Sequence, residues 1–386
     1  MSYHGRFESQ KPKKKKSPMK VILIIVAILL VLVISAIIAG VVYYNSVLNK
    51  MNHVEVPKIQ YTTAPVDLLD SPEAEETEIA AATETTEAVP TETTEPPHVP
   101  SSADYINILV VGQAARMGEK SDTERMADTA IVCTINTYEK KLTLTSLLRD
   151  SLVRPPSYKG HEFGKIKLTT VYHLGSYYSH GDIAGSMELM NMTLYDSFGI
   201  EVDHNIEVGF DAVIKAIDVL HGVGIELTQE EADYLNAQDE WISYEVQPGY
   251  NWLDGAGALC YARMRKAEGD GDSDIKRTAR QRNLINALIS HMKEFDLTTL
   301  QGLINEVLPM VTTSMTNQEI TDLIMKLLPM LSELKVETGG TCPVQGTYRG
   351  TEVDIYKDGM YHSVLEFEVP QQKKLMRAIT EGESAD

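Results

Sequence analysis

The feature that most constrains this chain is a stretch of sequence, residues 21–44, in which no side chain is charged and Ile, Leu, Val and Ala dominate. As a helix, this stretch would reach about 36 Å, which exceeds the roughly 30 Å hydrocarbon core of a bilayer. A cleaved signal peptide is the alternative, but its apolar region usually holds only about 7–15 residues. The stretch therefore predicts a retained helix that spans a lipid bilayer once, and it excludes a fully soluble cytoplasmic protein.

The residues on either side of this predicted span indicate its orientation. Residues 1–20 form a basic tail with a cluster of lysines at 11–16, whereas the sequence after the span is acidic. Positive charge is retained on the cytoplasmic side of a membrane, and Tyr43 and Tyr44 suit the aromatic belt at the outer interface. We therefore expect a single-pass protein of the cell membrane with a cytoplasmic N-terminus and an extracellular main domain.

Residues 45–103 are rich in Glu, Thr and Pro and hold few large apolar side chains, most clearly in the segment 84–97. Such a composition cannot bury enough apolar surface to offset the entropy that is lost on ordering. We expect a disordered acidic stalk. It is either a spacer that holds the next domain away from the membrane or a tether of no particular length, and both place that domain outside the cell.

From residue 104 to residue 386 the apolar pattern becomes that of a folded domain. Short β-branched runs alternate with amphipathic stretches, which favours an α/β fold with a mixed central β-sheet and helices on both faces. The expected strands are 105–112, 129–136, 142–146, 204–208, 224–227, 335–337, 352–356 and 362–368. The expected helices are 182–198, 210–220, 254–263, 274–294, 297–308, 317–331 and one from residue 371.

The composition excludes several kinds of partner and site. The chain has 55 acidic residues against 35 Lys and Arg, a net charge of −20, so a nucleic-acid backbone would be repelled. Cys133, Cys260 and Cys342 are too few for a disulfide scaffold or a Cys-rich zinc site, although one pair could form a disulfide outside the membrane. The sequence has no His cluster at metal-ligand spacing, no Walker-type loop and no dinucleotide fingerprint.

Within this acidic domain, basic residues gather over Arg263–Arg282, at the start of an expected helix. Cations in the first turn oppose the helix dipole and cost about 0.3–1 kcal/mol each. Arg277 and Arg280 also share a helix face with Leu284, which should point inward. Since a helix N-terminus is itself an anion site, the pattern predicts a phosphate-binding cluster. The alternative is a solvated face whose arginines pair with the aspartates at 270–274.

A second charged feature, Arg149-Asp150, directly follows the expected strand 142–146. Folds of the α/β class usually place their sites at the carboxyl ends of sheet strands. The alternative is a surface ion pair, worth about 1 kcal/mol or less. Further along, Lys165 belongs to an alternating Lys165-Ile166-Lys167 pattern, where it either adds a cation to a site or lies at the edge of a strand.

Six segments, taken in order, give the domain a resemblance to a known family. They are Ile106–Gly112, Ala127-Asp128-Thr129, Ser146–Asp150, Lys165-Ile166, Tyr261–Arg265 and Arg277–Arg282. Over residues 104–295 the domain resembles the LytR-CpsA-Psr family of membrane-anchored bacterial wall enzymes. Each segment alone is a weak signal, but the ordered set is specific. Residues 296–386 lie beyond these segments and are assigned no role other than completing or extending the domain.

The resemblance implies a phosphotransferase. Such enzymes take a glycopolymer, of teichoic acid or capsule type, from polyprenyl pyrophosphate and join it through a phosphodiester to the C6 hydroxyl of N-acetylmuramic acid in peptidoglycan. Mg²⁺ would be the cofactor, held by a carboxylate and by phosphate oxygens. The prenyl chain would need an apolar slot, for which the methionine-rich helix 182–198 is a candidate. Without the resemblance, such a helix is more often plain core.

The resemblance also implies roles for individual residues. Asp128 matches a family carboxylate associated with the metal and the acceptor hydroxyl, although by itself it would be a turn residue before a strand. The expected catalytic residues are Asp128, Arg149 and Arg263, and Asp128 is the expected Mg²⁺ ligand. The expected pyrophosphate-binding residues are Arg116, Arg149, Lys165, Arg263, Arg265, Arg277 and Arg280.

One position departs from the family pattern. The family usually has Gly-x-Asp-x-Arg after its first strand, whereas here Ala114 stands where that Asp would be and Arg116 is retained. The loss should weaken metal binding, or leave one carboxylate to serve both metal and base, unless an acid at 119–124 replaces it. The alternative function is therefore a non-catalytic protein that binds polyprenyl-linked phosphate or wall polymer. A membrane-bound transcriptional regulator is disfavoured, because the short basic tail has no fold able to read DNA.

Overall fold

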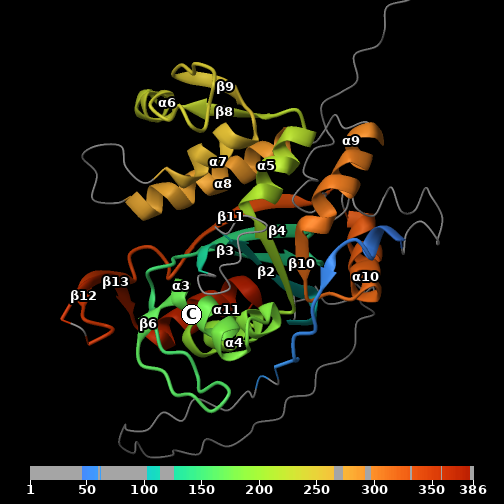
Figure 1. The fold of residues 1–386 in the computed structure, drawn as a ribbon. Coiled ribbons are helices and arrows are strands. Elements are labelled where there is room, and N and C mark those ends of the chain that lie inside the picture. The colour runs from blue at the N-terminus through green and yellow to red at the C-terminus, as the bar shows by residue number, and fades with distance from the viewer. Residues whose placement is uncertain are drawn as a thin grey trace, which may run out of the picture.

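Figure 1 shows the chain in a computed structural model, which describes residues 46–59, 61, 102–113, 126–264, 273–291, 297–330, 333–357 and 359–382. Several sequence-based predictions lie outside these residues. They are the basic tail 1–20, the membrane span 21–44, most of the stalk, and Ala114, Arg116 and Arg265. Among the helices that the structure does describe, none combines the length and the apolar character needed to cross a membrane.

A mixed sheet of seven strands organises the described part of the domain. In spatial order the strands are β1 (Asn52–His53), β10 (Val311–Thr313), β7 (His204–Gly209), β2 (Tyr105–Gln113), β3 (Ala127–Asn136), β4 (Lys141–Leu147) and β11 (Lys335–Cys342). The pairs β1/β10, β2/β7 and β4/β11 are parallel, and the other neighbouring pairs are antiparallel. The predicted mixed central sheet is confirmed.

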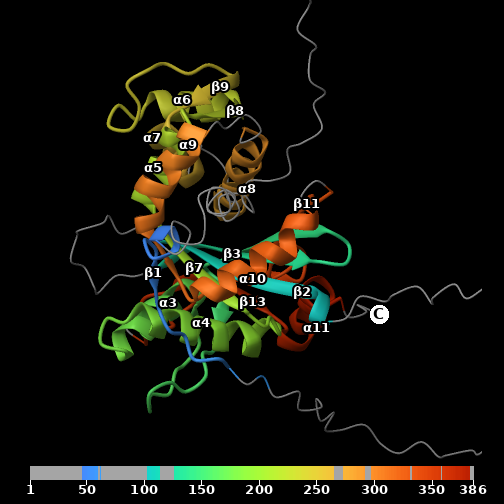
Figure 2. The same cartoon turned by 90° about the vertical axis from the view of Figure 1, so that its right-hand side faces the viewer.

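Side chains that alternate along the central strands divide between two hydrophobic cores, one on each face of the sheet. On β2, Ile108 belongs to one core and its neighbour Leu109 to the other, and both are fully buried. The helices on the Leu109 side are α3 (Leu168–Tyr178), α4 (Ile183–Phe198) and α11 (Val369–Thr380), and those on the Ile108 side are α5 (Phe210–Val219), α7 (Gly255–Arg263) and α8 (Ser273–His291) (Figure 1 and Figure 2). The sheet is therefore covered on both faces, as the apolar runs of its strands require.

A smaller unit, residues 223–253, packs against α7 and α8 and is called the β8–β9 unit. It consists of an antiparallel pair, β8 (Val223–Leu227) and β9 (Gly249–Leu253), with α6 (Gln229–Asn236) between them in the chain. The helix α6 begins with a capping box: Thr228 Oγ1 accepts a hydrogen bond from Glu231 N, and the Glu231 carboxylate accepts one from Thr228 N.

The remaining described elements are shorter or lie at the edges of the domain. They are β5 (Leu152–Val153), β6 (Ile166–Lys167), β12 (Tyr348–Val353), β13 (His362–Phe367), α9 (Leu297–Gly302), a π-helical turn (Leu303–Val307), α10 (Asn317–Leu327) and the 3₁₀ turns Ser102–Asp104, Leu308–Met310 and Leu328–Met330. The sequence did not predict α3, α6, β1, β5, β9 or β10, and the strand expected at 335–337 extends to Cys342.

Residues 46–59, which lie within the predicted stalk, belong to the folded domain. Val47, Leu48 and Met51 are buried in the core on the Ile108 side, and β1 extends the sheet beside β10. The prediction of a disordered stalk over 45–103 is therefore wrong for this part of the chain. The acidic composition of the stretch as a whole concealed a short apolar cluster at its beginning.

The methionine-rich helix α4 belongs to the core on the Leu109 side. Met187 and Met190 are at most 1% exposed and pack with Leu189, Leu194 and Phe198. The same core includes side chains of α3 and α11, so apolar neighbours surround more than one face of α4. This burial agrees with the interpretation of the helix as plain core.

All three cysteines lie among the described residues, and each is buried and free. The disulfide that the sequence allowed is therefore absent. Burial raises the pKa of the Cys133 thiol to about 12 and that of Cys260 to about 11. Both thiols stay protonated at neutral pH, so neither is an activated nucleophile.

Candidate functional site

A pocket of about 460 Å³ lies at the edge of the sheet where β3 begins, next to the ends of β2 and β7. It is lined by Asp128, Thr129, Phe210, Tyr234, Gln238, Trp241, Cys260, Arg263, Arg277 and Gln281. These residues come from β3, α5, α7, α8 and the β8–β9 unit. The carboxyl ends of parallel strands are where α/β folds usually bind ligands, and the parallel pair β2/β7 ends here.

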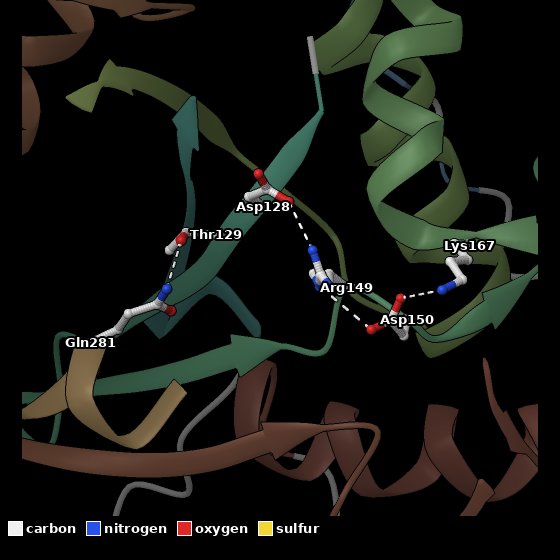
Figure 3. A network of polar contacts seen from close by, with 6 residues as sticks. All are labelled: Asp128, Thr129, Arg149, Asp150, Lys167 and Gln281. Carbon is white, nitrogen blue, oxygen red and sulfur yellow. Dashed lines mark hydrogen bonds and ion pairs between the residues drawn. The ribbon is translucent and has the colours of Figure 1, made fainter. Parts of the chain in front are cut away.

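A chain of ion pairs fixes the carboxylate of this pocket (Figure 3). Arg149 Nη1 lies 3.1 Å from Asp128 Oδ1, and Arg149 Nε lies 3.4 Å from Asp150 Oδ2. Lys167 Nζ lies 2.7 Å from Asp150 Oδ1. The ion pair between Arg149 and Asp150, which the sequence left as an alternative, is thus present, but Arg149 also contacts the pocket through Asp128.

Arg263, the last residue of α7, presents its guanidinium to two aromatic rings of the pocket. Its Cζ lies 4.6 Å from the centre of the Phe210 ring and 5.4 Å from that of Trp241. Stacking on aromatic faces holds a guanidinium plane in place and leaves its N–H edge available to an anion. The side chain of Arg263 is exposed.

Two arginines of α8, Arg277 and Arg280, are buried, as their spacing predicted. Arg277 is 5% exposed and Arg280 7%, and Leu284 shares their buried face. Arg277, one of the predicted pyrophosphate-binding residues, lines the pocket. A buried guanidinium at the wall of a pocket favours an anionic ligand, because such a ligand compensates the lost hydration of the cation.

Arg280 does not line this pocket, and its prediction as a pyrophosphate ligand is wrong in this respect. Its Nε donates to Glu231 Oε1 at 2.7 Å and its Nη1 to the Met264 carbonyl at 3.1 Å. Both side chains of the ion pair are about one-tenth exposed. Arg280 therefore joins α8 to α6 and α7, with a carboxylate far along the chain in place of the expected ligand.

Lys165 is also absent from the pocket. It is exposed, whereas Lys167, two residues on, makes the ion pair with Asp150. Arg116 and Arg265 lie outside the described residues, so the structure gives no position for them. Of the predicted site residues, the structure brings Asp128, Arg263 and Arg277 together in this pocket. Arg149 forms an ion pair with Asp128.

Several residues of the site were not predicted. Gln281 Nε2 donates to Thr129 Oγ1 at 2.8 Å (Figure 3). Arg282 Nη1 donates to Ser146 Oγ at 3.3 Å, so the two hydrogen bonds hold the middle of α8 over β3 and β4. Both donors belong to the segment Arg277–Arg282, which was one of the six segments that indicated the family, so the sequence did point to this part of the site. The aromatic wall of Phe210 and Trp241 had no comparable local signal, because these rings reach the pocket from separate elements.

The described residues fit a metal ion only in part. No group of three or more His, Cys, Asp or Glu among them could hold one, and Asp128 is the one carboxylate that they contribute to the pocket. Mg²⁺ commonly binds through one or two carboxylates together with substrate phosphates and waters. The pocket therefore fits a Mg²⁺ ion that is shared with a bound phosphate, and not a metal caged by protein ligands alone.

Residues 71–368 match the sequence model of the LytR_cpsA_psr family. This chain belongs to that family. The match spans the sheet from β2 onward and includes every described residue of the pocket, so the resemblance inferred from the six segments is confirmed.

Among the relatives of this chain, Biofilm regulatory protein A of Streptococcus mutans is 28% identical over 234 residues, which cover 59% of this chain and 54% of that protein. The polyisoprenyl-teichoic acid–peptidoglycan teichoic acid transferase TagT of Bacillus subtilis is 30% identical over 192 residues, which cover 49% of this chain and 53% of that protein. The chain thus spans about half the length of the relatives it matches.

Solved structures of similar proteins share the fold. TagT bound to LIIa-WTA has a TM-score of 0.52 and 22% identity, over 73% of this chain and 92% of that one. A protein from Streptococcus agalactiae has a TM-score of 0.55 and 21% identity, over 73% of this chain and 90% of that one. The mixed sheet with its helices is therefore the LytR_cpsA_psr fold.

Proposed function

We propose that this chain is a phosphotransferase that moves a glycopolymer, of teichoic acid or capsule type, from polyprenyl pyrophosphate to peptidoglycan. The observation that carries the proposal is the pocket in which Arg263 and Arg277 meet Asp128. Two cations suit a pyrophosphate, and a carboxylate beside them suits the hydroxyl that attacks it. Family membership supports this chemistry, because relatives such as TagT and TagU are named teichoic acid transferases.

The proposed reaction is a phosphoryl transfer to the C6 hydroxyl of N-acetylmuramic acid. The hydroxyl oxygen forms a bond to the phosphorus nearer the polymer, the bond from that phosphorus to the bridging oxygen breaks, and polyprenyl phosphate leaves. The hydroxyl proton must be taken up as the new bond forms. Asp128 lines the pocket with its side chain 29% exposed, and in this proposal its carboxylate accepts the proton.

The cations of the pocket act on the leaving group. Negative charge develops on the bridging oxygen as its bond lengthens, and Arg263 and Arg277 supply N–H donors to it. The two rings beneath Arg263 restrict its guanidinium before the substrate binds, which lowers the entropy lost on binding. Arg149 orients Asp128 through their 3.1 Å contact.

We assign Mg²⁺ to the same pocket as the cofactor. Asp128 would hold the ion together with phosphate oxygens of the substrate. When bound, Mg²⁺ neutralises charge on the phosphates and adds to the effect of the two arginines.

The proposed location is the cell membrane, with residues 21–44 as a single span, the N-terminus in the cytoplasm and the domain outside. Both substrates are found there, since the donor carries a lipid chain and the acceptor is the wall. The acidic chain also disfavours a nucleic-acid partner.

A second function is favoured by Ala114, which replaces the carboxylate that the family usually has after its first strand. With a single carboxylate for metal and base, the chain would bind polyprenyl-linked phosphate or wall polymer without transferring it. The two functions share the anion pocket and differ in turnover.

The test uses the full-length protein in detergent, a labelled glycopolymer on polyprenyl pyrophosphate, and peptidoglycan fragments, with and without Mg²⁺. We expect Mg²⁺-dependent transfer, which falls by about 10²–10³ in Arg263→Ala because one donor to the developing charge is lost. Arg349→Ala is the matched control, because Arg349 is an exposed arginine that pairs with Glu366 on β13.

Binding of the donor without turnover, together with turnover in Ala114→Asp, would establish the second function. If Arg263→Ala and Arg349→Ala bind and transfer equally well, the assignment of the pocket to pyrophosphate is wrong.

A further inference from the structure

The outward face of the β8–β9 unit has an unusual composition. On β8, Val223, Ile225 and Leu227 point into the core on the Ile108 side. The outward positions of β9 carry two large aromatic residues, Tyr250 and Trp252, which are 69% and 45% exposed. A half-buried strand pair normally places polar side chains on its solvent face, so this face differs from that pattern.

Both aromatic side chains lie close to a glycine: Tyr250 to Gly224 of β8, and Trp252 to Gly222, which directly precedes β8. In the register of the pair, Trp252 is opposite Gly224 and Tyr250 is opposite Glu226, but each ring leans along the strand. A Cβ atom on Gly222 would overlap the Trp252 ring, and one on Gly224 would overlap the Tyr250 ring. The absence of these Cβ atoms allows each aromatic side chain to pack against the backbone, as in other glycine–aromatic pairs of sheets. Tyr250 and Trp252 nevertheless keep a large part of their surface exposed to solvent.

A polar pocket of about 310 Å³ adjoins this aromatic face. It is lined by Asp218, His221, Gly222, Tyr244, Trp252 and Asp254. Trp252 Nε1 donates to the His221 carbonyl at 2.6 Å, which fixes the indole at the rim of the pocket. The ring is therefore held in place before any ligand binds.

Hydrogen bonds also hold the two carboxylates of the pocket. Asp218 Oδ1 accepts from Gly255 N at 2.8 Å, and Asp254 Oδ1 accepts from Tyr244 Oη at 3.0 Å. The Oδ2 atoms of both aspartates take no part in these bonds. The pocket thus offers fixed acceptors for hydroxyl or amide N–H groups beside the indole.

We propose that this face, defined by Tyr250, Trp252 and the adjoining pocket, binds a glycan strand of uncharged amino sugars. Open aromatic faces stack on the C–H face of a pyranose ring, and carboxylate oxygens accept hydrogen bonds from its hydroxyl and N-acetyl groups. The pocket lining holds two aspartates and neither Lys nor Arg. An anionic polymer linked by phosphodiesters would be repelled there, which favours the glycan of the acceptor over the donor polymer.

The position of this face relative to the catalytic pocket suits an acceptor strand. The link between α6 and β9 contributes Trp241 to the catalytic pocket and Tyr244 to the pocket beside Trp252. The two sites are thus separated by three positions of the same segment. The inference rests on the proposed function in one respect, which is that the acceptor is the glycan of peptidoglycan.

The binding test uses the full-length protein and a β1,4-linked hexamer of N-acetylglucosamine, with affinity measured by calorimetry. We expect Tyr250→Ala to weaken binding by about tenfold or more, because one stacking surface is lost. Tyr361→Ala is the matched control, since Tyr361 is 71% exposed at the end of the β12–β13 pair and should leave affinity unchanged. Gly224→Ala should also weaken binding, because it displaces the Tyr250 ring.

Equal affinities of Tyr250→Ala and Tyr361→Ala, or no measurable binding by the unchanged protein, would overturn the inference. Tighter binding of poly(glycerol phosphate) than of the hexamer would also overturn it, since the face would then serve an anionic polymer. In the transfer assay we expect Tyr250→Ala to raise KM for peptidoglycan fragments and to leave kcat unchanged. Hexamer binding that depends on Tyr250, in a protein without transfer activity, would refute the proposed function and leave the sugar site standing.

Discussion

The buried contact between Glu231 and Arg280 provides a test of whether this arginine serves the fold or the ligand. The two side chains are 11% and 9% exposed, and they meet at 2.7 Å. In Arg280→Met the carboxylate would stay buried without its cation, which costs about 3–5 kcal/mol. Each kcal/mol lowers Tm by about 2–4 °C in a large domain, so we expect a decrease of roughly 6–20 °C.

The assay is thermal unfolding of the full-length protein, followed by circular dichroism. The double variant Glu231→Gln/Arg280→Met removes both charges and keeps an acceptor for the capping box, so it should recover part of the lost Tm. Arg263→Met is the control, because this exposed residue should change Tm by less than about 2 °C. An unchanged Tm in Arg280→Met, combined with weaker binding of the pyrophosphate donor, would refute a structural role for Arg280.

Other features of the fold give further predictions. Leu48→Ala should lower the free energy of unfolding by about 2–5 kcal/mol in urea titrations, since Leu48 is fully buried, and a change within about 0.5 kcal/mol would argue against the packing of residues 46–59. Gly175→Ala should lower the free energy of unfolding by about 1–3 kcal/mol, because the new Cβ would overlap the backbone of Gly185 on α4. Gly350→Ala is the control, since the space around Gly350 is open and the free energy of unfolding should hardly change. Burial lowers the pKa of His204 below its usual 6.5, although nearby carboxylates act in the opposite direction. On acidification the unfolded chain therefore binds the proton before the folded protein does. The free energy of unfolding should then fall as the pH drops below about 6.5. His204→Gln should therefore reduce the difference between urea midpoints measured at about pH 7.5 and pH 5.5, and an unaltered difference would contradict this assignment.

The sequence predicted most of the central sheet and its long helices, because their patterns are local. The run at 105–112 appears as β2, Tyr105–Gln113, and the helix expected at 182–198 appears as α4, Ile183–Phe198. In both cases the spacing of the apolar residues indicated the type of element, and the residues at its ends indicated where it begins and ends. Asp182, for example, caps α4 by accepting a hydrogen bond from Ala184 N.

The helix α3 was missed because its residues are poor helix formers. The segment Leu168–Tyr178 contains β-branched residues, a glycine and several aromatics. It is helical because it packs closely on α4, where Gly175 approaches Gly185. Contacts of this kind join separate segments and leave no periodic signal in the sequence.

The site was predicted in part for a related reason. The spacing of Arg277 and Arg280 correctly indicated burial, because burial depends on one helix face. The residues around them come from other parts of the fold: Arg277 lines the same pocket as Asp128, whereas Arg280 pairs with Glu231 of α6. The capping box at Thr228 and Glu231 could have revealed α6, but the sequence alone does not show which arginine its carboxylate meets.

Residues 46–59 follow the predicted membrane span almost directly and already pack in the folded domain, which limits the distance between the domain and the bilayer. A span over 21–44 would leave a single residue, Asn45, before the helical turn that contains Val47 and Leu48. The domain would then sit directly on the outer leaflet, within reach of a pyrophosphate at the headgroup level, and its orientation would be restricted. The acidic stretch would no longer set a distance to the membrane, since it joins Tyr61 and Ser102, two points of the same folded body.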